Sequence, residues 1–554
     1  MVFDLRFERW LSVRRRSGVT EIIAPFSITD AIKDDPIVSM SAPRPDFQGA
    51  SLEFLIGLLS VALALTEEED WEVAGEHPPT PEQLRDALMK LPSAFMLDGD
   101  GPRFLQDGST PDFDGQGDIA IENLLIDAAG ENTQKLNKDL FVKRGRVASM
   151  GLPAAAMALM TLQNYAPAGG QGHRTSMRGG GPLTTLVEPR GDGRGYDASQ
   201  ERPLWELIHA NLQLASGDWE LPTDWLSPAG QAVAELVWPW LAVTIVSTGK
   251  PPRQVSPVWP DAHPFQAFFG MPRRIRLAFD PQGGVCELTG QPAPVLVRSF
   301  RTRNLGVDYG DGLWRHPFSP HYQDKGRWRP VHPQPDGLGW KDWAGLVIGG
   351  EDERAADCVS CHAQRFNRPY AVRAFGYDMD NMKARGWVEA LLPVWPQAKM
   401  AEGVANAMAI AAAQMVEATR LASNLLVGAV IAARFKSDVK GDFSPIKASL
   451  WSETERSFMA RLDAAAMNNL ASAQAVLAFD GGYGAALRKA ACAIFDTEVD
   501  LAGLAMADAQ QLVTARRNLV SALNGYGASG NKLFAAMGLP KPEKAAKKSK
   551  EKVV

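Results

Sequence analysis

Apolar residues recur at helical spacing along most of the C-terminal third of the chain. From about residue 397, long stretches rich in Ala, Leu and Met are separated by short breaks that contain Gly, Asp or Pro. This periodicity is typical of amphipathic helices that pack against one another. We therefore predict an antiparallel four-helix bundle over residues 397–540. Its helical stretches are expected at Gly403–Phe435, Trp451–Phe479, Ala485–Phe495 and Asp508–Leu523.

The first 393 residues instead contain both segments with helical spacing and segments in which apolar and polar residues alternate, as in β-strands. Alternating positions from Phe3 to Ile23 predict a small β unit that turns at the basic run Arg14–Gly18. Together with the bundle this predicts an α+β protein, with a large irregular mixed α/β N-terminal domain at 1–393 and a hinge near Pro393–Pro396. Further helices are expected at Asp46–Leu65, Glu82–Leu91, Ile119–Ala129 and Ala154–Gln163, and strands at Leu183–Val187, Pro272–Phe279 and Pro294–Arg303.

Composition narrows the class of protein. Of the 554 residues, 45% are hydrophobic and 22% are charged, as in an ordinary folded protein. The net charge of −6 lacks the basic excess of most nucleic-acid binders, so any such surface must be local. The apolar run Phe54–Leu65 is too short to span a bilayer, and no signal peptide is evident. We expect a cytoplasmic protein without membrane contact, ending in a basic disordered tail at 541–554.

A glycine-rich segment at 166–182 is the strongest candidate for chemistry. It contains six glycines, and Arg174 and Arg178 lie within it. Glycine lets the backbone approach a ligand closely, and successive N–H groups with arginines nearby favour an anion such as phosphate. No Gly-Lys-Ser/Thr follows, which argues against a nucleoside-triphosphate loop. A flexible surface loop remains an equally good interpretation of a glycine-rich segment.

A second basic run lies between the expected helices. Phe141 is followed by Lys143, Arg144 and Arg146. An aromatic ring beside three cations suits base stacking and phosphate contact in single-stranded nucleic acid. A solvated basic turn is an equally good interpretation.

The four cysteines are too few for a disulfide scaffold. Cys358, Cys361 and His362 match the c-type haem attachment pattern, but attachment requires export, for which we find no signal. A zinc site would need further ligands, with Cys286 as one supplement. A metal- or thiol-dependent enzyme that uses Cys358, Cys361 and His362 is therefore the alternative function.

Several motifs taken together resemble the large subunit of the type I-E CRISPR Cascade complex, the CasA family. The similarity extends over nearly the whole chain, and the order and spacing of the motifs carry it. They are Trp10-Leu-Ser-Val-Arg14, the glycine segment running into Arg178-Gly-Gly-Gly-Pro-Leu-Thr-Thr185, Gly312-Leu-Trp-Arg-His-Pro-Phe-Ser-Pro320, Gly376-Tyr-Asp-Met-Asp-Asn-Met-Lys383 and Glu453-Thr-Glu-Arg456.

The resemblance implies a subunit without enzymatic activity and without a cofactor. It implies recognition of the protospacer-adjacent motif (PAM) in double-stranded DNA through the minor groove, followed by strand separation and R-loop formation. The implied partners are the other Cascade subunits, the CRISPR RNA, target double-stranded DNA and the helicase–nuclease. In such complexes guide RNA reads the sequence by pairing, while protein reads only a short duplex motif.

The resemblance also assigns residues. The family's glycine loop corresponds to Ala168, Gly169, Gly170 and Gln171, and its basic strand end corresponds to Arg301 to Arg303. Its wedge corresponds to Asp380, Asn381 and Met382, and the run from Phe141 to Arg146 falls where the family contacts guide RNA and duplex. Some family members hold zinc near Phe279–Gly290, where this chain has only Cys286, so we expect no metal site.

Three functions therefore compete. The first is a non-enzymatic DNA-recognition subunit, and the second is the cysteine-dependent enzyme. The third is a structural scaffold in which the glycine segment and Asn381 have no role in binding. We find no compact set of acid, base and nucleophile at motif spacing, which favours the first over the second.

Overall fold

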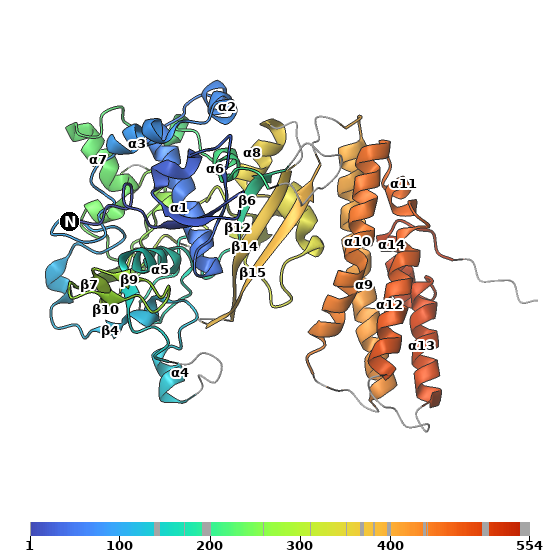
Figure 1. Ribbon diagram of the computed structural model, residues 1–554. Helices are drawn as coiled ribbons and strands as arrows, with labels where there is room; N and C mark the ends of the chain where they lie inside the picture. Colours follow the sequence, from blue (N-terminus) through green and yellow to red (C-terminus); the bar gives the residue numbers. More distant parts are fainter. Residues whose placement is uncertain are drawn as a thin grey trace, which may run out of the picture. The chain divides into compact units, whose positions relative to one another are not determined.

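The chain divides into two compact units. A computed structural model describes residues 2–137, 144–170, 172–190, 201–258, 260–310, 312–350, 352–365, 370–380, 383–395, 400–435, 439, 441–500 and 509–542. One unit comprises Met1–Leu338 and Gly345–Val394, and the other comprises Gly339–Ala344 and Trp395–Val554. The first is mixed α and β and the second is helical (Figure 1), so the predicted α+β class is confirmed.

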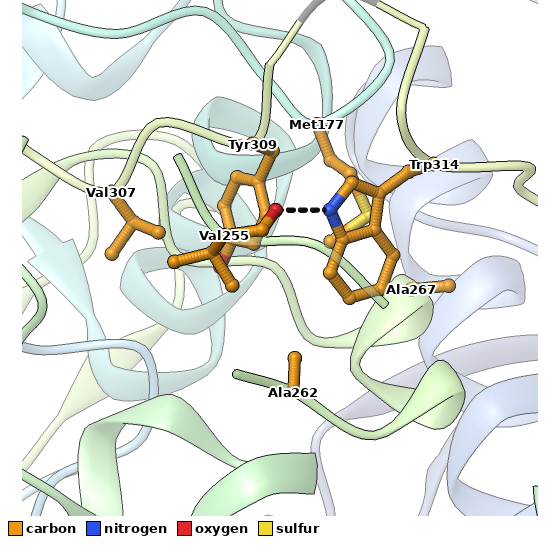
Figure 2. Packing of buried hydrophobic residues seen from close by; sticks show 7 residues of the cluster. All are labelled: Met177, Val255, Ala262, Ala267, Val307, Tyr309 and Trp314. Carbon is orange, nitrogen blue, oxygen red and sulfur yellow. Dashed lines mark hydrogen bonds between the residues drawn. The ribbon is translucent and has the colours of Figure 1, made fainter. Parts of the chain in front are cut away.

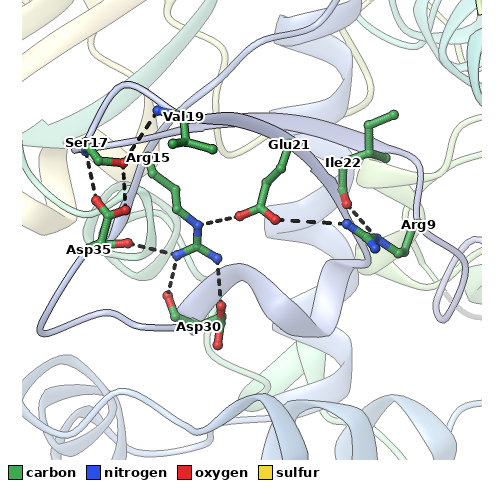
Figure 3. Close-up of polar contacts among 8 residues, drawn as sticks. All are labelled: Arg9, Arg15, Ser17, Val19, Glu21, Ile22, Asp30 and Asp35. Carbon is green, nitrogen blue, oxygen red and sulfur yellow. Dashed lines mark hydrogen bonds and ion pairs between the residues drawn. The ribbon is translucent and has the colours of Figure 1, made fainter.

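The N-terminal β unit is a three-stranded antiparallel sheet in the order β2-β1-β3. The predicted turn at Arg14–Gly18 joins its first two strands. Two of the three arginines there are paired with acids: Arg15 contacts the carboxylates of Glu21 and Asp30 (Figure 3), and Arg14 contacts Glu201. The third, Arg16, is exposed. The strands are β1 Leu11–Arg15, β2 Thr20–Ile23 and β3 Ile37–Met40.

Helix α1, Pro45–Leu63, forms the core of the first unit. Phe54 packs edge-on against the rings of Trp10, Phe95 and Phe104. α1 and Val404–Arg434 are long and apolar enough to cross a membrane. However, 83% of the most apolar stretch of α1 is buried inside the protein, as expected for a helix in a protein core. The other helices of this unit are α2 Glu68–Glu76, α3 Pro81–Met89, α4 Glu131–Lys135, α5 Leu152–Tyr165, α6 Leu204–Ala210, α7 Pro228–Val237 and α8 Asp357–Arg365.

The two predicted arginine-rich strands pair with each other. β7, Arg274–Asp280, runs antiparallel to β10, Leu296–Arg303, and Arg274 lies opposite Arg303. The predicted helix at Ile119–Ala129 is wrong, because Ile119–Ala120 pairs with β10 as strand β4 and a short 3-10 helix follows. Pairing with a distant strand overrides the local pattern here. The remaining small strands are β5 Met150–Gly151, β8 Gly284–Val285 and β9 Pro292–Ala293.

A long hairpin dominates the next sheet (Figure 1, yellow). β14, Tyr370–Asp380, pairs with β15, Lys383–Val394, and its other edge pairs with β6, Thr184–Pro189. This order places the segment after the glycine loop beside the hairpin. A separate sheet contains β11 His321–Asp324, β12 Arg327–Pro330 and β13 Glu353–Arg354.

Within its described residues, the second unit contains four long helices and two short ones. The expected stretch Trp451–Phe479 is divided in two, because Asn469 adopts a left-handed conformation with φ of 53° and ends α10. Asparagine is one of the few residues that accept this conformation at a helix end. The helices are α9 Val404–Arg434, α10 Ser444–Asn468, α11 Ala473–Ala478, α12 Tyr483–Asp500, α13 Ala509–Leu523 and α14 Gly527–Ala536.

A segment from the middle of the chain completes this helical unit. The indole N–H of Trp340 donates to the carbonyl of Trp451 at 2.7 Å. Its ring lies 4.7 Å from that of Trp451 and 4.5 Å from that of Phe458, centroid to centroid. The helical repeat contains no signal for this segment, and the predicted boundary at 393–397 did not include it.

Candidate nucleic-acid interface

The glycine loop, defined as residues 166–182, joins α5 to β6. Its two ends are closed by backbone hydrogen bonds, with Ser176 N–H donating to Ala166 at 3.1 Å and Gly181 N–H donating to Tyr165 at 3.0 Å. Between them, His173 N–H donates to Gly170 at 2.9 Å. The described residues of the loop therefore have a defined backbone conformation.

Met177 anchors the middle of the loop in a buried apolar cluster (Figure 2). Its side chain is 7% exposed and lies among buried residues that include Tyr309 and Trp314. The Trp314 indole N–H donates to the carbonyl of Val255 at 2.8 Å. Trp314 belongs to the motif at 312–320, so one function of that motif is to support the glycine loop.

A buried carboxylate in α1 holds both the start and the end of the loop. Glu53, 2% exposed, accepts hydrogen bonds from the hydroxyls of Tyr165 and Thr184, each at 2.6 Å. It also forms a 2.7 Å ion pair with Arg178. Burial and the Glu53 carboxylate raise the pKa of the Tyr165 hydroxyl, which keeps it a neutral donor.

This network corrects the prediction for Arg178. Its side chain is 3% exposed, and its second terminal nitrogen donates to Thr184 at 2.9 Å. A guanidinium enclosed in this way has no access to a DNA phosphate. Arg178 instead positions the loop.

Arg174 is also engaged within the chain. Its Nε donates to the Ser247 hydroxyl at 2.9 Å, and it forms a 3.1 Å ion pair with Asp308. Its side chain retains 26% exposure. Arg174 lines a cavity of about 440 Å³ below the loop, together with Ala168, His173, Arg178, Asp308, Tyr322, Arg329 and His332. The contribution of Arg174 to phosphate binding stays a prediction, and the Asp308 carboxylate offsets part of the positive charge of Arg174.

The first part of the loop lies against the adjoining ends of β7 and β10. Leu305, just beyond β10, donates its N–H to the carbonyl of Gly172 at 2.9 Å. Arg273, just before β7, donates to the carbonyl of Pro167. The predicted basic strand end is therefore adjacent to the glycine loop in space.

The two arginines predicted at that strand end differ in their contacts. Arg301 forms a 2.8 Å ion pair with Asp118, and both side chains are about half exposed. Arg303 forms no ion pair with any residue that the structure describes, and its Nε is buried without a hydrogen-bond partner. Arg303 is therefore the better candidate for contacting DNA.

The last part of the loop lies against the base of the hairpin tip. A Cβ placed on Gly181 would be 2.5 Å from Met379 Cγ and 2.7 Å from the Tyr377 carbonyl oxygen. Tyr377 in turn donates its hydroxyl to Asp46 of α1 at 2.6 Å. Trp387 packs 5.6 Å from the ring of Tyr165 at the end of α5. The hairpin base is thus fixed to the helices that flank the loop.

The wedge itself is described only in part. Asp380 ends β14 and is exposed, whereas Asn381 and Met382 lie outside the described residues. Close to the tip, Arg385 forms two hydrogen bonds with the Asp378 carboxylate, at 2.8 and 2.6 Å. This pair joins the two strands at the point where their register shifts.

The remaining predicted sites are less complete. Phe141 and Lys143 lie outside the described residues, as does Gln171. Arg144 donates to the carbonyl of Gln134 at 3.0 Å, and Arg146 is exposed. The role of these two arginines in binding RNA therefore stays a prediction.

The alternative enzyme site has no support in the described residues. Cys358 is buried and donates its thiol to the carbonyl of Thr185 at 3.3 Å, and burial raises its thiol pKa. A nucleophilic cysteine needs a lowered pKa and access to substrate. Cys361 is exposed and Cys286 is buried. The described residues contain no group of three or more His, Cys, Asp or Glu that could hold a metal ion.

Two glycines of the loop allow a matched test of its role. Gly170 and Gly181 have similar positive φ angles, 70° and 63°, but a Cβ on Gly170 would meet no atom within 4 Å. We expect Gly170→Ala to cost about 1–2 kcal/mol in stability from backbone strain alone. Gly181→Ala adds the clash with the hairpin base, so its loss is expected to be at least about 1 kcal/mol larger.

Urea unfolding of both variants measures this difference. Equal losses would contradict tight packing of the loop on the hairpin. DNA binding by the same two variants provides a second readout, because a loop that contacts the duplex with its open backbone should lose affinity in Gly170→Ala despite the small loss of stability. A scaffold without DNA contact predicts unchanged binding for that variant.

Comparison with known proteins identifies the fold. The chain resembles Cse1 from Acidimicrobium ferrooxidans, with a TM-score of 0.64 at 16% identity over 98% of this chain and 99% of that one. It resembles Thermus thermophilus CasA (Cse1), with a TM-score of 0.62 at 15% identity over 96% and 99%. It also resembles a chain of a CRISPR RNA-guided surveillance complex, with a TM-score of 0.61 at 16% identity over 94% and 99%.

At these identities the structural matches establish the fold alone. Membership of a family is established by a match to the sequence model of that family. The model described as CRISPR-associated protein Cse1 matches residues 4–488, which is most of the chain. The resemblance inferred from the motifs is thereby confirmed, since CasA and Cse1 denote the same protein in Thermus thermophilus. This chain belongs to the CRISPR-associated protein Cse1 family.

Proposed function

We propose that the chain is the non-catalytic large subunit of a CRISPR RNA-guided surveillance complex, in which it recognises the PAM of target double-stranded DNA. It then starts strand separation and helps to recruit the helicase–nuclease. Its partners are the other Cascade subunits, the CRISPR RNA and the target duplex. Family membership and the fold shared with a chain of such a complex support this assignment.

One observation carries the assignment of a DNA surface. The glycine loop contacts the β7–β10 strand ends through Pro167, Gly169 and Gly172 and the hairpin base through Gly181. Three elements that are far apart in sequence therefore form one surface. The open backbone at Gly170 permits close approach to a duplex. Arg303 supplies donors for minor-groove acceptors, which are displayed at A·T and G·C pairs alike.

A binding experiment on the assembled complex tests this function. The guide-complementary target is held constant, the flanking base pairs are randomised, and bound duplexes are sequenced. We expect enrichment of a short flanking motif, and we expect complexes with Gly170→Ala to lose that enrichment. Equal recovery of all flanking sequences by the parent complex would contradict PAM recognition by this subunit.

The predicted wedge concerns the step after motif binding. The double substitution Asn381→Ala, Met382→Ala should slow R-loop formation on linear DNA, because inserted side chains compensate for the few kcal/mol lost when a base step unstacks. Negative supercoiling already favours opening, so it should partly rescue the variant. Initial motif binding should suffer less.

Motif binding and strand opening are measured separately, each on linear and supercoiled targets. If Asn381 serves only the hairpin turn, for which Asp-Asn is well suited, both steps should be impaired equally and supercoiling should not rescue either. That result would exclude a wedge.

A further inference from the structure

Arg273 lies just before β7, beneath residues 167–170 of the glycine loop. One terminal nitrogen donates to the Pro167 carbonyl, and the other is so close to the loop that a Cβ on Gly169 would lie 2.5 Å from it. The backbone of Arg273 is fixed on both sides by Gln163, through hydrogen bonds of 2.9 and 3.0 Å. The guanidinium is therefore held at a defined position under the loop.

The charge of Arg273 has no acidic partner among the residues that the structure describes. Its Nε is buried without a hydrogen-bond partner, and burial lowers its pKa to about 10, so it remains protonated at neutral pH. Arg174 and Arg178, by contrast, are neutralised by Asp308 and Glu53. An enclosed cation without a counter-ion carries an uncompensated desolvation cost. A bound anion would offset that cost.

The glycine that follows Gly169 has open space beside it. Gly170 has φ of 70°, and its Cβ position has no neighbour within 4 Å. His173 adds no charge there, because burial and Arg273 lower its pKa. The positive charge under the loop therefore comes from Arg273.

We propose that Arg273 is the cation of a phosphate-binding site at Gly169 and Gly170 of the glycine loop, and that a phosphodiester group of the target duplex occupies this site. The inference rests on the proposed function and deepens it. It replaces the two arginines of the loop, which the sequence suggested for this role, by an arginine more than ninety residues further along the chain.

The test uses assembled complexes that carry Arg273→Gln or Arg273→Lys. Binding of a duplex with target and flanking motif is measured between roughly 50 and 200 mM salt. We expect Arg273→Gln to weaken binding about 10-fold and to reduce the slope of log K against log salt by about 1, as the loss of one phosphate contact requires. Arg273→Lys keeps the charge and should retain the slope. Arg298→Gln, which removes an exposed arginine paired with Asp280, is the matched control and should not change it.

Weaker binding with an unchanged salt slope in Arg273→Gln would show that Arg273 only positions the loop, and it would overturn the proposal. Unchanged binding would overturn it as well. Thermal unfolding and complex assembly separate a folding defect in Arg273→Gln from the loss of a phosphate contact, and a reduced slope in a folded Arg273→Lys complex would contradict the proposal. Failure of the proposed function is recognised separately, because the parent complex would then bind duplexes with and without the flanking motif equally.

Discussion

Glu53→Gln is expected to destabilise the mixed α/β unit by about 3–5 kcal/mol, because it leaves the Arg178 guanidinium buried without a counter-ion. Glu53 and Arg178 are 2% and 3% exposed, so water cannot take over the lost interaction. The amide NH2 of glutamine must also either face Arg178 or take the place of the oxygen that accepts from Tyr165 and Thr184. Urea unfolding followed by tryptophan fluorescence measures the loss, and DNA binding should fall because both ends of the glycine loop are released.

The control is an ion pair of the same unit at the surface. Arg14 and Glu201 are paired with 34% and 47% exposure, so Glu201→Gln should cost at most about 1 kcal/mol. The double variant Glu53→Gln, Arg178→Met removes both charges and should be less destabilised than the sum of the two single variants. Additive losses, or a loss below about 1 kcal/mol for Glu53→Gln, would contradict a coupled buried pair.

Hydrophobic periodicity predicted the long helices well, and its failures have identifiable causes. α1, α5, α9 and α13 lie within a few residues of the expected ranges, because their apolar faces are long and regular. Ile119–Ala129 has the same local pattern but pairs with β10, and pairing with a distant strand is not visible locally. The end of α10 depends on one residue, Asn469, in a left-handed conformation.

The candidate site could be located from the sequence but not described. Motif order indicated the glycine loop, the strand end and the hairpin, and the structure places these elements next to one another. Motif order could not indicate which arginines are available to bind DNA. Arg178, for example, is neutralised by the carboxylate of Glu53, which lies 125 residues away in the sequence. Arg273 lies outside the glycine motif altogether, and only its position under the loop reveals it.

Trp340→Ala is expected to destabilise the helical unit by about 3–5 kcal/mol, the usual cost of truncating a buried tryptophan. Trp340 is 2% exposed, packs on Trp451 and Phe458, and donates its indole N–H to the Trp451 carbonyl. The chain passes between the two units at 338/339, at 344/345 and at 394/395. The predicted hinge at Pro393–Pro396 therefore lies near only one of these three passages, and residues 339–344 provide the other two.

Hydrogen exchange in the full chain tests this attachment, with peptides from α10 as the readout for the helical unit. Protection of α10 should fall in Trp340→Ala, while α1 and β10 keep theirs. Trp328→Ala is the control, because Trp328 lies on β12 of the other unit, only partly buried against Arg354. A fragment of residues 395–542, which lacks the Trp340 segment, should unfold at a lower urea concentration than the same helices in the full chain. Equal stability of the fragment and the full-length helical unit would show that residues 339–344 contribute nothing to it.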